Sequence, residues 1–233
     1  MCGRFTLTRQ DRRELAELLG VDEKDLRDYR PHYNIAPLQD HFVLRSKYER
    51  RDLLPARWGL VNSWATSSSS AASCINAKAE TIDTRPSFKD AFVKRRCVVP
   101  ADGFYEWQGR KDHREPLWIH PANGGLLWLA GLYESWQPEP GHWQRTFTII
   151  TTRANQLIEP FHDRMPVILD ERTAEDWINP GERDPLRLKS LLVPAPDDNL
   201  VLRPASSLVN NVENDGPELL VPDSNVPMQR NLF

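Results

Sequence analysis

The chain has 233 residues, of which 39% are apolar and 27% are charged, with eight Trp and eight Phe. This composition is sufficient for a packed core and excludes an intrinsically disordered chain. The mean hydropathy is −0.58, and no stretch approaches the roughly 18 consecutive apolar residues of a membrane span. The first residues lack the apolar segment of a secretory signal, so we expect a cytoplasmic protein, nucleoid-associated if it is bacterial.

The net charge of −3 hides an uneven distribution along the chain. Residues 1–115 carry 21 Lys and Arg against 17 Asp and Glu, whereas residues 116–233 carry 9 against 16. This asymmetry permits a basic groove on an acidic protein, although solvated surface charges would give the same count. The three cysteines are too few and too scattered for a disulfide framework or a zinc site, so no metal and no cofactor are expected.

The first predicted element is a helix over residues 9–19, with a capping signal that begins at Thr8 and an end at Gly20. Apolar, β-branched and aromatic runs then predict strands at residues 41–47, 97–99, 117–120, 126–133, 146–152 and 166–169. Short helices are predicted near residues 87–94 with a cap at Ser87, near 173–178 with a cap at Thr173, and over 185–192. The strands are too closely spaced for βαβ crossovers, which favours an α+β fold with a mainly antiparallel sheet.

Two segments are predicted to be flexible. Residues 66–73, with the sequence TSSSSAAS, contain no core-forming side chain and should form a surface loop. The tail over residues 221–233 is polar and interrupted by Pro. Because there is no internal repeat and no break in composition, we expect a single domain over residues 1–220.

Cys2 directly follows the initiator Met, and a small residue at this position allows an aminopeptidase to remove Met1. Cys2 would then carry a free α-amine and a thiol on adjacent carbons. An α-amine titrates at about pH 7.7–8.0, so part of it is neutral at pH 7. It can attack an aldehyde to form an imine, onto which the thiol can close as a five-membered thiazolidine. From the dipeptide alone, an ordinary small residue at the chain start remains the alternative.

Residues 73–81 place polar side chains in a pattern suited to a site. Asn76, Lys78 and Glu80 alternate with small apolar residues, which predicts that all three face one side of a strand. Asn can orient a carbonyl or an amine, and Lys can hold a phosphate as a point charge. A half-exposed strand would give the same alternation.

Two further residues have the chemistry of general acids or bases. Glu106 stands between Tyr105 and Trp107, where desolvation would raise the pKa of its carboxyl group toward neutrality. A structural glutamate paired with an arginine is the alternative. His162 lies between apolar and charged residues in a loop that leads to a strand, and it could shuttle protons, although a histidine in a loop is commonly inert.

Together, the segments MCGRF, INAKAET, RRCVVPADGFYEW, FHDRMPVIL and VNNVEND closely resemble the SOS-response-associated peptidase (SRAP) family of abasic-site DNA–protein crosslinking proteins. The resemblance runs from Cys2 to about Leu220, with the motifs in the family's order. It implies the SRAP fold, which has a barrel-like core, a few peripheral helices and a DNA-binding groove. It also implies binding to single-stranded DNA, or to single-strand/double-strand junctions, that contain an abasic site.

The resemblance implies a role for each matched catalytic residue. Cys2, after loss of Met1, would link to the ring-opened aldehyde, and Asn76 would position the amine and the sugar. Glu106 would be the acid/base beside the aldehyde carbon, and His162 would serve ring opening and reversal of the crosslink. Self-processing peptidase activity ahead of the cysteine and a strand-cleaving lyase activity are further expectations from the family.

A flexible, negatively charged strand also needs contacts to its phosphates and bases. Candidates for phosphate contacts are Arg4, Lys78, Arg85, Arg96 and Arg164, and candidates for stacking on bases are Trp64, Phe88 and Trp107. Recognition should be independent of sequence because the lesion has no base to read. We expect a monomer with no membrane partner.

Three features depart from the family pattern. The INAKAET motif more usually carries Arg at Lys78, and Lys lacks the two-pronged grip of Arg on a phosphate. Glu213 of VNNVEND stands where some members have a basic residue, which would make this rim repel phosphate. The serine-rich loop after Trp64 could change how the strand is wedged.

Two other function classes stay open from the sequence. An amidohydrolase would use the α-amine of an N-terminal cysteine as a base and the thiol to attack an amide, and it would turn over small amides without DNA. A non-enzymatic nucleic-acid-binding module would keep its binding after Cys2→Ala and would form no covalent product.

Overall fold

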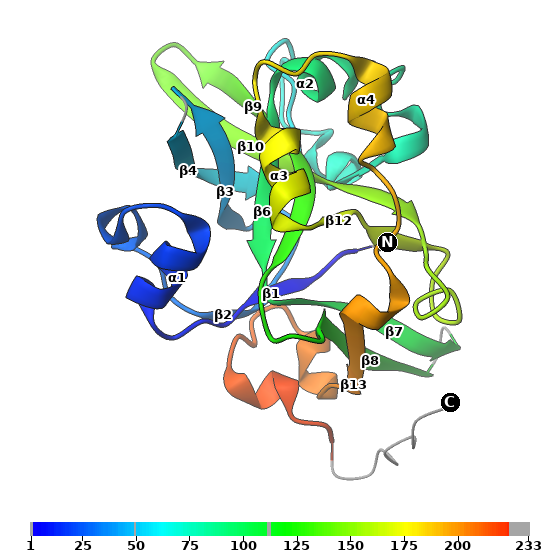
Figure 1. The fold of residues 1–233 in the computed structure, drawn as a ribbon. Helices are drawn as coiled ribbons and strands as arrows, with labels where there is room; N and C mark the ends of the chain where they lie inside the picture. Colours follow the sequence, from blue (N-terminus) through cyan, green and yellow to red (C-terminus); the bar gives the residue numbers. More distant parts are fainter. Residues whose placement is uncertain (1, 49, 111–112, 224–233) are drawn as a thin grey trace.

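The computed structural model describes residues 2–48, 50–110 and 113–223. Its strands form two sheets, with the helices at their margins (Figure 1). In spatial order, the smaller sheet contains β13 (Leu200–Pro204), β8 (His113–Pro121), β7 (Gly103–Arg110), β1 (Phe5–Leu7) and β2 (His32–Ile35). The larger sheet contains β11 (Arg164–Pro166), β10 (His142–Arg153), β4 (Arg50–Trp58), β3 (Asp40–Lys47), β6 (Arg96–Ala101), β9 (Leu127–Glu139) and β12 (Ile168–Leu169), and β5 (Asn76–Lys78) pairs with β10.

Five strands of the larger sheet close into a barrel. The pairings run from β10 through β4, β3, β6 and β9, and β9 pairs with β10 again. Only β10–β4 and β10–β5 are parallel among the described pairings. A long stretch of chain separates the partners in both, which provides the crossover that a parallel pair requires. The predicted α+β class with a mainly antiparallel, barrel-like core is therefore confirmed.

Alternating residues of the barrel strands fill its interior. Trp58 of β4 stacks on Phe147 of β10, with 6.2 Å between ring centroids, and both side chains are fully buried. Phe5 of β1 packs against this core, where its ring meets Trp58 edge-on with 5.1 Å between ring centroids. Cys2 belongs to the same apolar cluster. The core of the barrel thus fixes the position of the N-terminal strand.

In the part of the chain that the structure describes, four α-helices cover the margins of the sheets: α1 (Arg12–Leu19), α2 (Lys89–Lys94), α3 (Glu171–Ile178) and α4 (Pro185–Ser190). One-turn 3-10 helices lie at Glu23–Leu26, Ala71–Cys74, Ala79–Thr81, Asp197–Asn199, Ser207–Asn210 and Pro217–Leu220. Helix α1 ends at Gly20, as predicted, and Gly20 adopts a left-handed φ of 64°. A glycine tolerates this conformation because it has no Cβ.

The predicted helix caps were wrong in each case. Asp11, not Thr8, caps α1 by accepting hydrogen bonds from the backbone N–H groups of its first turn, because the Thr8 hydroxyl donates to Asp102 instead (2.7 Å). Asp170 caps α3 and accepts from the N–H of Thr173 at 2.7 Å. Helix α2 begins after Phe88 and has no side-chain cap.

The loop over residues 66–73 is mostly exposed, but the statement that it holds no core side chain was wrong. Ala71 is buried and packs with Val61 and Trp136 in a small apolar cluster. The indole N–H of Trp136 donates to the carbonyl of Ala65 at 2.7 Å. Gly59 runs close to the backbone of Ala71, since a Cβ on Gly59 would lie 2.9 Å from the Ala71 carbonyl oxygen.

Strand β1 is held in place by the buried carboxylate of Asp102, which lies between β6 and β7. It accepts hydrogen bonds from the Thr6 hydroxyl at 2.6 Å and from the backbone N–H of Thr8 at 2.6 Å. The next residue, Gly103, makes room for the Trp118 ring, because a Cβ there would lie 2.1 Å from the indole nitrogen. These contacts connect the N-terminal strand to the strand that carries Glu106.

The C-terminal part of the described chain packs on the smaller sheet, below β2 in Figure 1. Val209 and Leu219 are fully buried against Tyr105. No helix among the described residues is long and apolar enough to cross a membrane. The predicted tail falls mainly on residues 224–233, which lie outside the described residues, and the single-domain prediction stays a prediction.

Candidate active site

Cys2 lies fully buried where β1 meets the barrel. Burial raises the pKa of its thiol to about 12, and the nearby negative charge of Glu106 adds to the effect. A thiol in these surroundings stays protonated at neutral pH and is a poor nucleophile until a base accepts its proton. A base close to Cys2 must therefore accept the thiol proton when the sulfur reacts.

Asn76 of β5 connects the barrel to Cys2. Its side-chain Nδ2 donates a hydrogen bond to the Cys2 carbonyl at 2.8 Å. Its Oδ1 is buried and has no hydrogen-bond partner among the described residues. Buried polar atoms are normally satisfied, so this oxygen is an acceptor available for an N–H group placed beside Cys2.

Glu106 of β7 is 4% exposed and faces the same region from the smaller sheet. Burial raises the pKa of its carboxyl group above the ordinary glutamate value, and the nearby His162 and Arg114 act in the opposite direction. The direction of the predicted shift is confirmed. The expectation that Tyr105 and Trp107 wall this carboxylate was wrong. Neighbouring residues of a strand point to opposite faces, and these two rings pack with Val209 instead.

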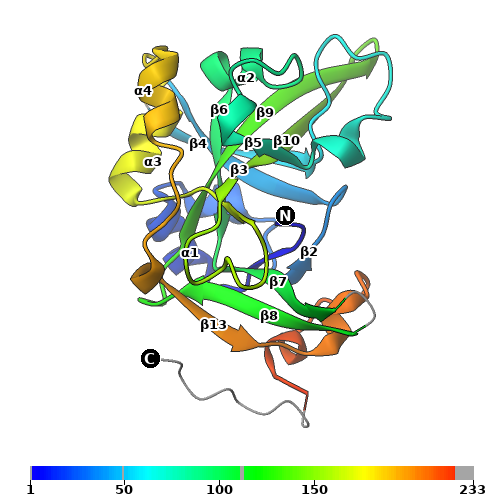
Figure 2. The same cartoon turned by 90° about the vertical axis from the view of Figure 1, so that its right-hand side faces the viewer.

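His162 lies in the loop before β11, and its ring is 29% exposed. The Nδ1 atom accepts a hydrogen bond from the backbone N–H of Arg164 at 2.9 Å. The Asp163 carboxylate lies 2.9 Å from Nδ1 and can pair with the protonated ring. In Figure 2, β5 and β10 lie above the N-terminal segment and β7 lies below it, so the site forms between the two sheets.

Arg4 and Trp107 contact each other beside the C-terminal segment. The Arg4 guanidinium lies over the Trp107 ring at 5.8 Å from its centroid. One of its nitrogens, Nη1, donates to Asn34 Oδ1 at 2.6 Å and to the Val209 carbonyl at 2.7 Å. The Trp107 indole N–H donates to Asn210 Oδ1 at 2.8 Å. Both predicted DNA contacts are thus oriented by the C-terminal segment, which contains the VNNVEND motif.

Three other predicted DNA contacts lie on the surface. Trp64 is 66% exposed, and Lys78 and Arg85 are exposed. None of the three side chains makes a hydrogen bond or an ion pair with another residue that the structure describes. Glu80 does not share the strand face with Lys78 as predicted, because β5 ends at Lys78 and Glu80 lies in the 3-10 helix that follows.

The placement of Arg96 argues against a phosphate contact. The residue is 5% exposed, and its guanidinium donates to five backbone carbonyls, those of Phe92, Val93, Trp177, Asn179 and Glu182. These bonds connect β6 to α2 and to the end of α3. Arg96 therefore acts as a structural residue in the free protein.

We expect Arg96→Met to lower the free energy of unfolding by about 3 kcal/mol, because it leaves buried carbonyls without donors. Urea unfolding measures this change. Arg85→Met, at an exposed cation, is the matched control and should stay within about 0.5 kcal/mol of the parent. Arg96→Met with unchanged stability and weakened DNA binding would contradict this assignment.

Phe88 and Arg164 are also less available than the sequence indicated. Phe88 is 6% exposed and packs in the apolar cluster between β6, β9 and the helices, so its ring cannot stack on a base without rearrangement. The Arg164 guanidinium binds the Glu80 carboxylate through two nitrogens, at 2.6 and 2.9 Å, and the Thr151 carbonyl at 2.6 Å. A phosphate at Arg164 would have to compete with Glu80.

Sequence reasoning missed Asn34, which orients Arg4. Asn34 is 2% exposed, and its Nδ2 donates to the carbonyls of Val209, Asn211 and Asn214. These carbonyls lie about 180 positions further along the chain, so no local pattern could reveal them. Arg114, which acts on the pKa of Glu106, was also missed although it lies only eight positions further along the chain, because pairing of β7 with β8 brings the two together only in the folded sheet.

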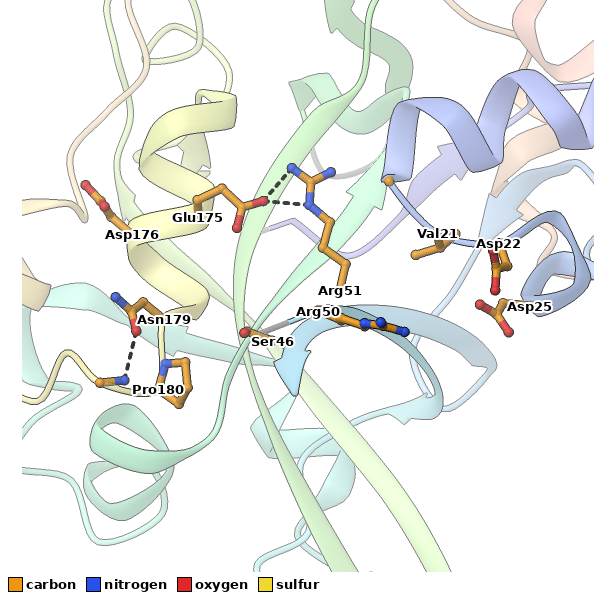
Figure 3. Close-up of a pocket in the computed structure, with 12 residues that line it drawn as sticks. Val21, Asp22, Asp25, Ser46, Arg50, Arg51, Glu175, Asp176, Asn179 and Pro180 are labelled. Carbon is orange, nitrogen blue, oxygen red and sulfur yellow. Dashed lines mark hydrogen bonds and ion pairs between the residues drawn. The ribbon is translucent and has the colours of Figure 1, made fainter. Parts of the chain in front are cut away.

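A surface cavity of about 990 Å³ lies away from these residues, between the end of α1, the β3–β4 hairpin and α3. Figure 3 shows Arg51 reaching from the hairpin to Glu175 of α3, with Asp22 and Asp25 on the opposite wall. The Arg51 Nε atom donates to Glu175 at 2.6 Å. None of the residues predicted for the site lines this cavity.

Comparisons with known proteins identify the family of this chain. The family model described as SOS response associated peptidase (SRAP) matches residues 1–212. This chain belongs to the SRAP family. Among curated proteins, it is 41% identical to "Abasic site processing protein YoqW" of Bacillus subtilis, with 94% of this chain and 99% of that protein covered. It is 36% identical to "Abasic site processing protein HMCES" of Gallus gallus, with 92% of this chain and 71% of that protein covered.

A solved structure supports the fold of this SRAP protein. A crystal structure of a protein from Bacteroides thetaiotaomicron matches with a TM-score of 0.82 and 24% identity, covering 95% of this chain and all of that one. At this identity the match shows the fold alone. The motifs that indicated the family, from MCGRF to VNNVEND, all lie in elements around Cys2 or in the C-terminal segment that packs beside it.

Proposed function

We propose that this protein captures abasic sites in single-stranded DNA, or at single-strand/double-strand junctions, by linking Cys2 to the ring-opened aldehyde. The observation that carries the proposal is the convergence on Cys2 of two sheets. Asn76 of β5 holds its carbonyl, and the charge of Glu106 from β7 acts on its thiol. The printed names of the relatives, abasic site processing proteins, support the substrate class.

The first bond forms between the Cys2 nitrogen and the sugar. Once Met1 is removed, the neutral α-amine of Cys2 adds to the C1′ aldehyde and gives a carbinolamine. The unpartnered Oδ1 of Asn76 accepts an N–H of this amine while Nδ2 holds the carbonyl. Protonated Glu106 then gives a proton to the carbinolamine hydroxyl, which leaves as water, and an iminium remains. The raised pKa of Glu106 keeps this proton available at a higher pH than in a free glutamate.

The second bond closes the ring. The Cys2 sulfur adds to C1′, and the Glu106 carboxylate takes the thiol proton, so a thiazolidine forms and Glu106 returns to its protonated state. The net reaction joins the aldehyde to the amine and thiol and releases one water, with no oxidant or reductant. His162 serves the opening of the sugar ring, in which a proton moves between the C1′ hydroxyl and the ring oxygen, and it serves the reversal of the crosslink.

The surface residues support a DNA groove next to Cys2. We assign Lys78 and Arg85 to phosphates and Trp64 to base stacking, since all three are exposed. Arg4 and Trp107 contribute from the other side. Phe88 and Arg96 are left out of this interface because both are buried.

Two further activities belong to the proposal. Removal of residues ahead of Cys2 is the reaction to which the peptidase name would refer in this chain. A strand-cleaving lyase activity follows from the iminium at C1′, because it acidifies the adjacent C2′ proton and permits elimination of the 3′ phosphate. The first activity liberates the α-amine of Cys2, and the second uses it.

The test is denaturing electrophoresis combined with intact mass spectrometry after mixing the protein with abasic single-stranded DNA. We expect a heat-stable adduct whose mass equals that of the protein without Met1 plus the DNA minus one water. DNA without an abasic site is the control and should give none. Absence of an adduct from protein that lacks Met1 would reject covalent capture, and turnover of small amides would then favour an amidohydrolase.

A further inference from the structure

Near the C-terminal end of β10, this strand and its neighbours β5 and β11 bring three cationic side chains together beside the candidate site. The parallel pairing of β5 with β10 places Lys78 opposite Thr151, and the antiparallel pairing with β11 places Arg164 opposite Arg153. Thr151 and Arg153 are two residues apart on one strand, so both point to the same face. Lys78, Arg153 and Arg164 therefore share one face of this three-stranded region.

One of the three cations is already neutralised. Arg164 is 8% exposed, and its guanidinium forms the two hydrogen bonds to Glu80 described above. Lys78 and Arg153 are exposed, and neither side chain forms a hydrogen bond or an ion pair within residues 2–48, 50–110 and 113–223. The positive charge of Arg153 reaches Glu80, where it contributes to the lowered pKa of that carboxyl group. Two cations are thus left on this face to bind an external anion.

The two exposed cations flank the residues assigned to the reaction. Asn76, which holds the Cys2 carbonyl, precedes Lys78 by two positions on the same face of β5. His162 precedes Arg164 by two positions, and Arg164 pairs with Arg153. The spacing between Lys78 and Arg153 corresponds to one neighbouring strand and two residues along it, roughly 8 Å between Cα atoms. Side chains of this length can converge on one group from such positions.

We propose that Lys78 and Arg153 form a phosphate subsite that holds the DNA backbone next to the abasic sugar. This inference rests on the proposed function and adds a residue that no family motif indicated. Lys78 offers a point charge, whereas the planar guanidinium of Arg153 can bind two phosphate oxygens at once. Arg153 thereby supplies from β10 the two-pronged contact that Lys78 cannot make from β5.

The experiment measures non-covalent binding of the Cys2→Ala protein, which cannot form the thiazolidine, over a series of salt concentrations. The probe is a single-stranded oligonucleotide with a tetrahydrofuran abasic analogue, which has no aldehyde and so cannot form an imine with the α-amine. We expect Arg153→Ala in this background to weaken binding several-fold at low salt. It should make the slope of log affinity against log salt shallower by up to about 0.7, the value for one phosphate contact on a single strand. Arg153→Lys should recover most of the slope but only part of the affinity.

Arg145→Ala is the matched control, because Arg145 is also exposed on β10 but lies toward its other end, opposite Ser135. It should leave both affinity and slope unchanged. An Arg153→Ala protein with the parent's slope, or one no different from Arg145→Ala, overturns the subsite. Thermal unfolding of each variant shows that a loss of binding is not a loss of fold.

The crosslinking assay with the unmodified protein separates the two proposals. If that protein forms the adduct and Arg153→Ala leaves the salt slope unchanged, the subsite is wrong and the proposed function stands. If the unmodified protein forms no adduct but the slope responds to Arg153→Ala, the phosphate contact stands and covalent capture is wrong. If the Cys2→Ala protein does not bind the oligonucleotide at all, the subsite is wrong, and the adduct assay with the unmodified protein alone decides covalent capture.

Discussion

Cys2→Ser is expected to abolish the heat-stable DNA adduct while leaving a reversible one. Serine keeps the α-amine, so an imine still forms with the abasic aldehyde and borohydride traps it. Ring closure fails because a hydroxyl is a far weaker nucleophile than a thiol whose proton Glu106 accepts. The buried position tolerates this substitution, since serine differs from cysteine only in having oxygen in place of sulfur.

Electrophoresis with and without borohydride measures both species. Cys2→Ala is the companion variant: it also keeps the α-amine and should give the trapped imine but no stable adduct. Cys97→Ser is the matched control, because Cys97 is a second fully buried cysteine and contributes no reacting atom in the proposal. A stable adduct formed by Cys2→Ser would contradict the thiazolidine.

Glu106→Gln is expected to slow crosslinking by about 10² or more with little change in DNA binding. The amide fills the same buried space but can neither give a proton to the carbinolamine nor take one from the thiol. Single-turnover rates of adduct formation measure the loss, and binding of the Cys2→Ala, Glu106→Gln double variant measures affinity. Equal losses in rate and affinity would make Glu106 a binding residue instead.

Glu106→Gln should also change how the free energy of unfolding depends on pH. Burial raises the pKa of Glu106 in the folded state, so the folded protein holds this proton more tightly than the unfolded chain does. The resulting stabilisation is full below the ordinary glutamate pKa of about 4.3 and is lost as the pH rises through the folded value. Relative to Glu106→Gln, the parent should therefore lose stability with increasing pH over this window. Urea unfolding at a series of pH values measures the difference, and a parent that instead gains stability over this window would contradict the shift.

Several features of this protein could be predicted from residues close together in the chain. Several strand positions followed from β-branched and aromatic runs, such as the one that became β10, because the composition of a strand is a local property. The strands β1, β2, β4 and β13 were not predicted. Gly20 marked the end of α1 for a similar reason. The candidate nucleophile and acid/base residues were found because Cys2, Asn76, Glu106 and His162 each lie in a short motif.

The caps and the electrostatic partners could not be predicted in this way. Thr8 looked like a cap until the fold brought Asp102 to its hydroxyl, and Arg96 looked like a phosphate ligand until five carbonyls surrounded it. The residues next to a charged side chain in the sequence do not show whether it will be exposed to solvent or buried against hydrogen-bond acceptors. That outcome depends on contacts made across the chain.

The sequence by itself determined the family, the mainly antiparallel sheet and the chemical types at the site, because each depends on short motifs or local periodicity. Only the tertiary structure decided which residues meet. Closure of the barrel through β10 brings β5 and β11 to its two edges, and so places Asn76, Lys78 and Arg153 on one side of Cys2. The folded sheet also buries Glu106 of β7, and that burial raises the pKa of its carboxyl group.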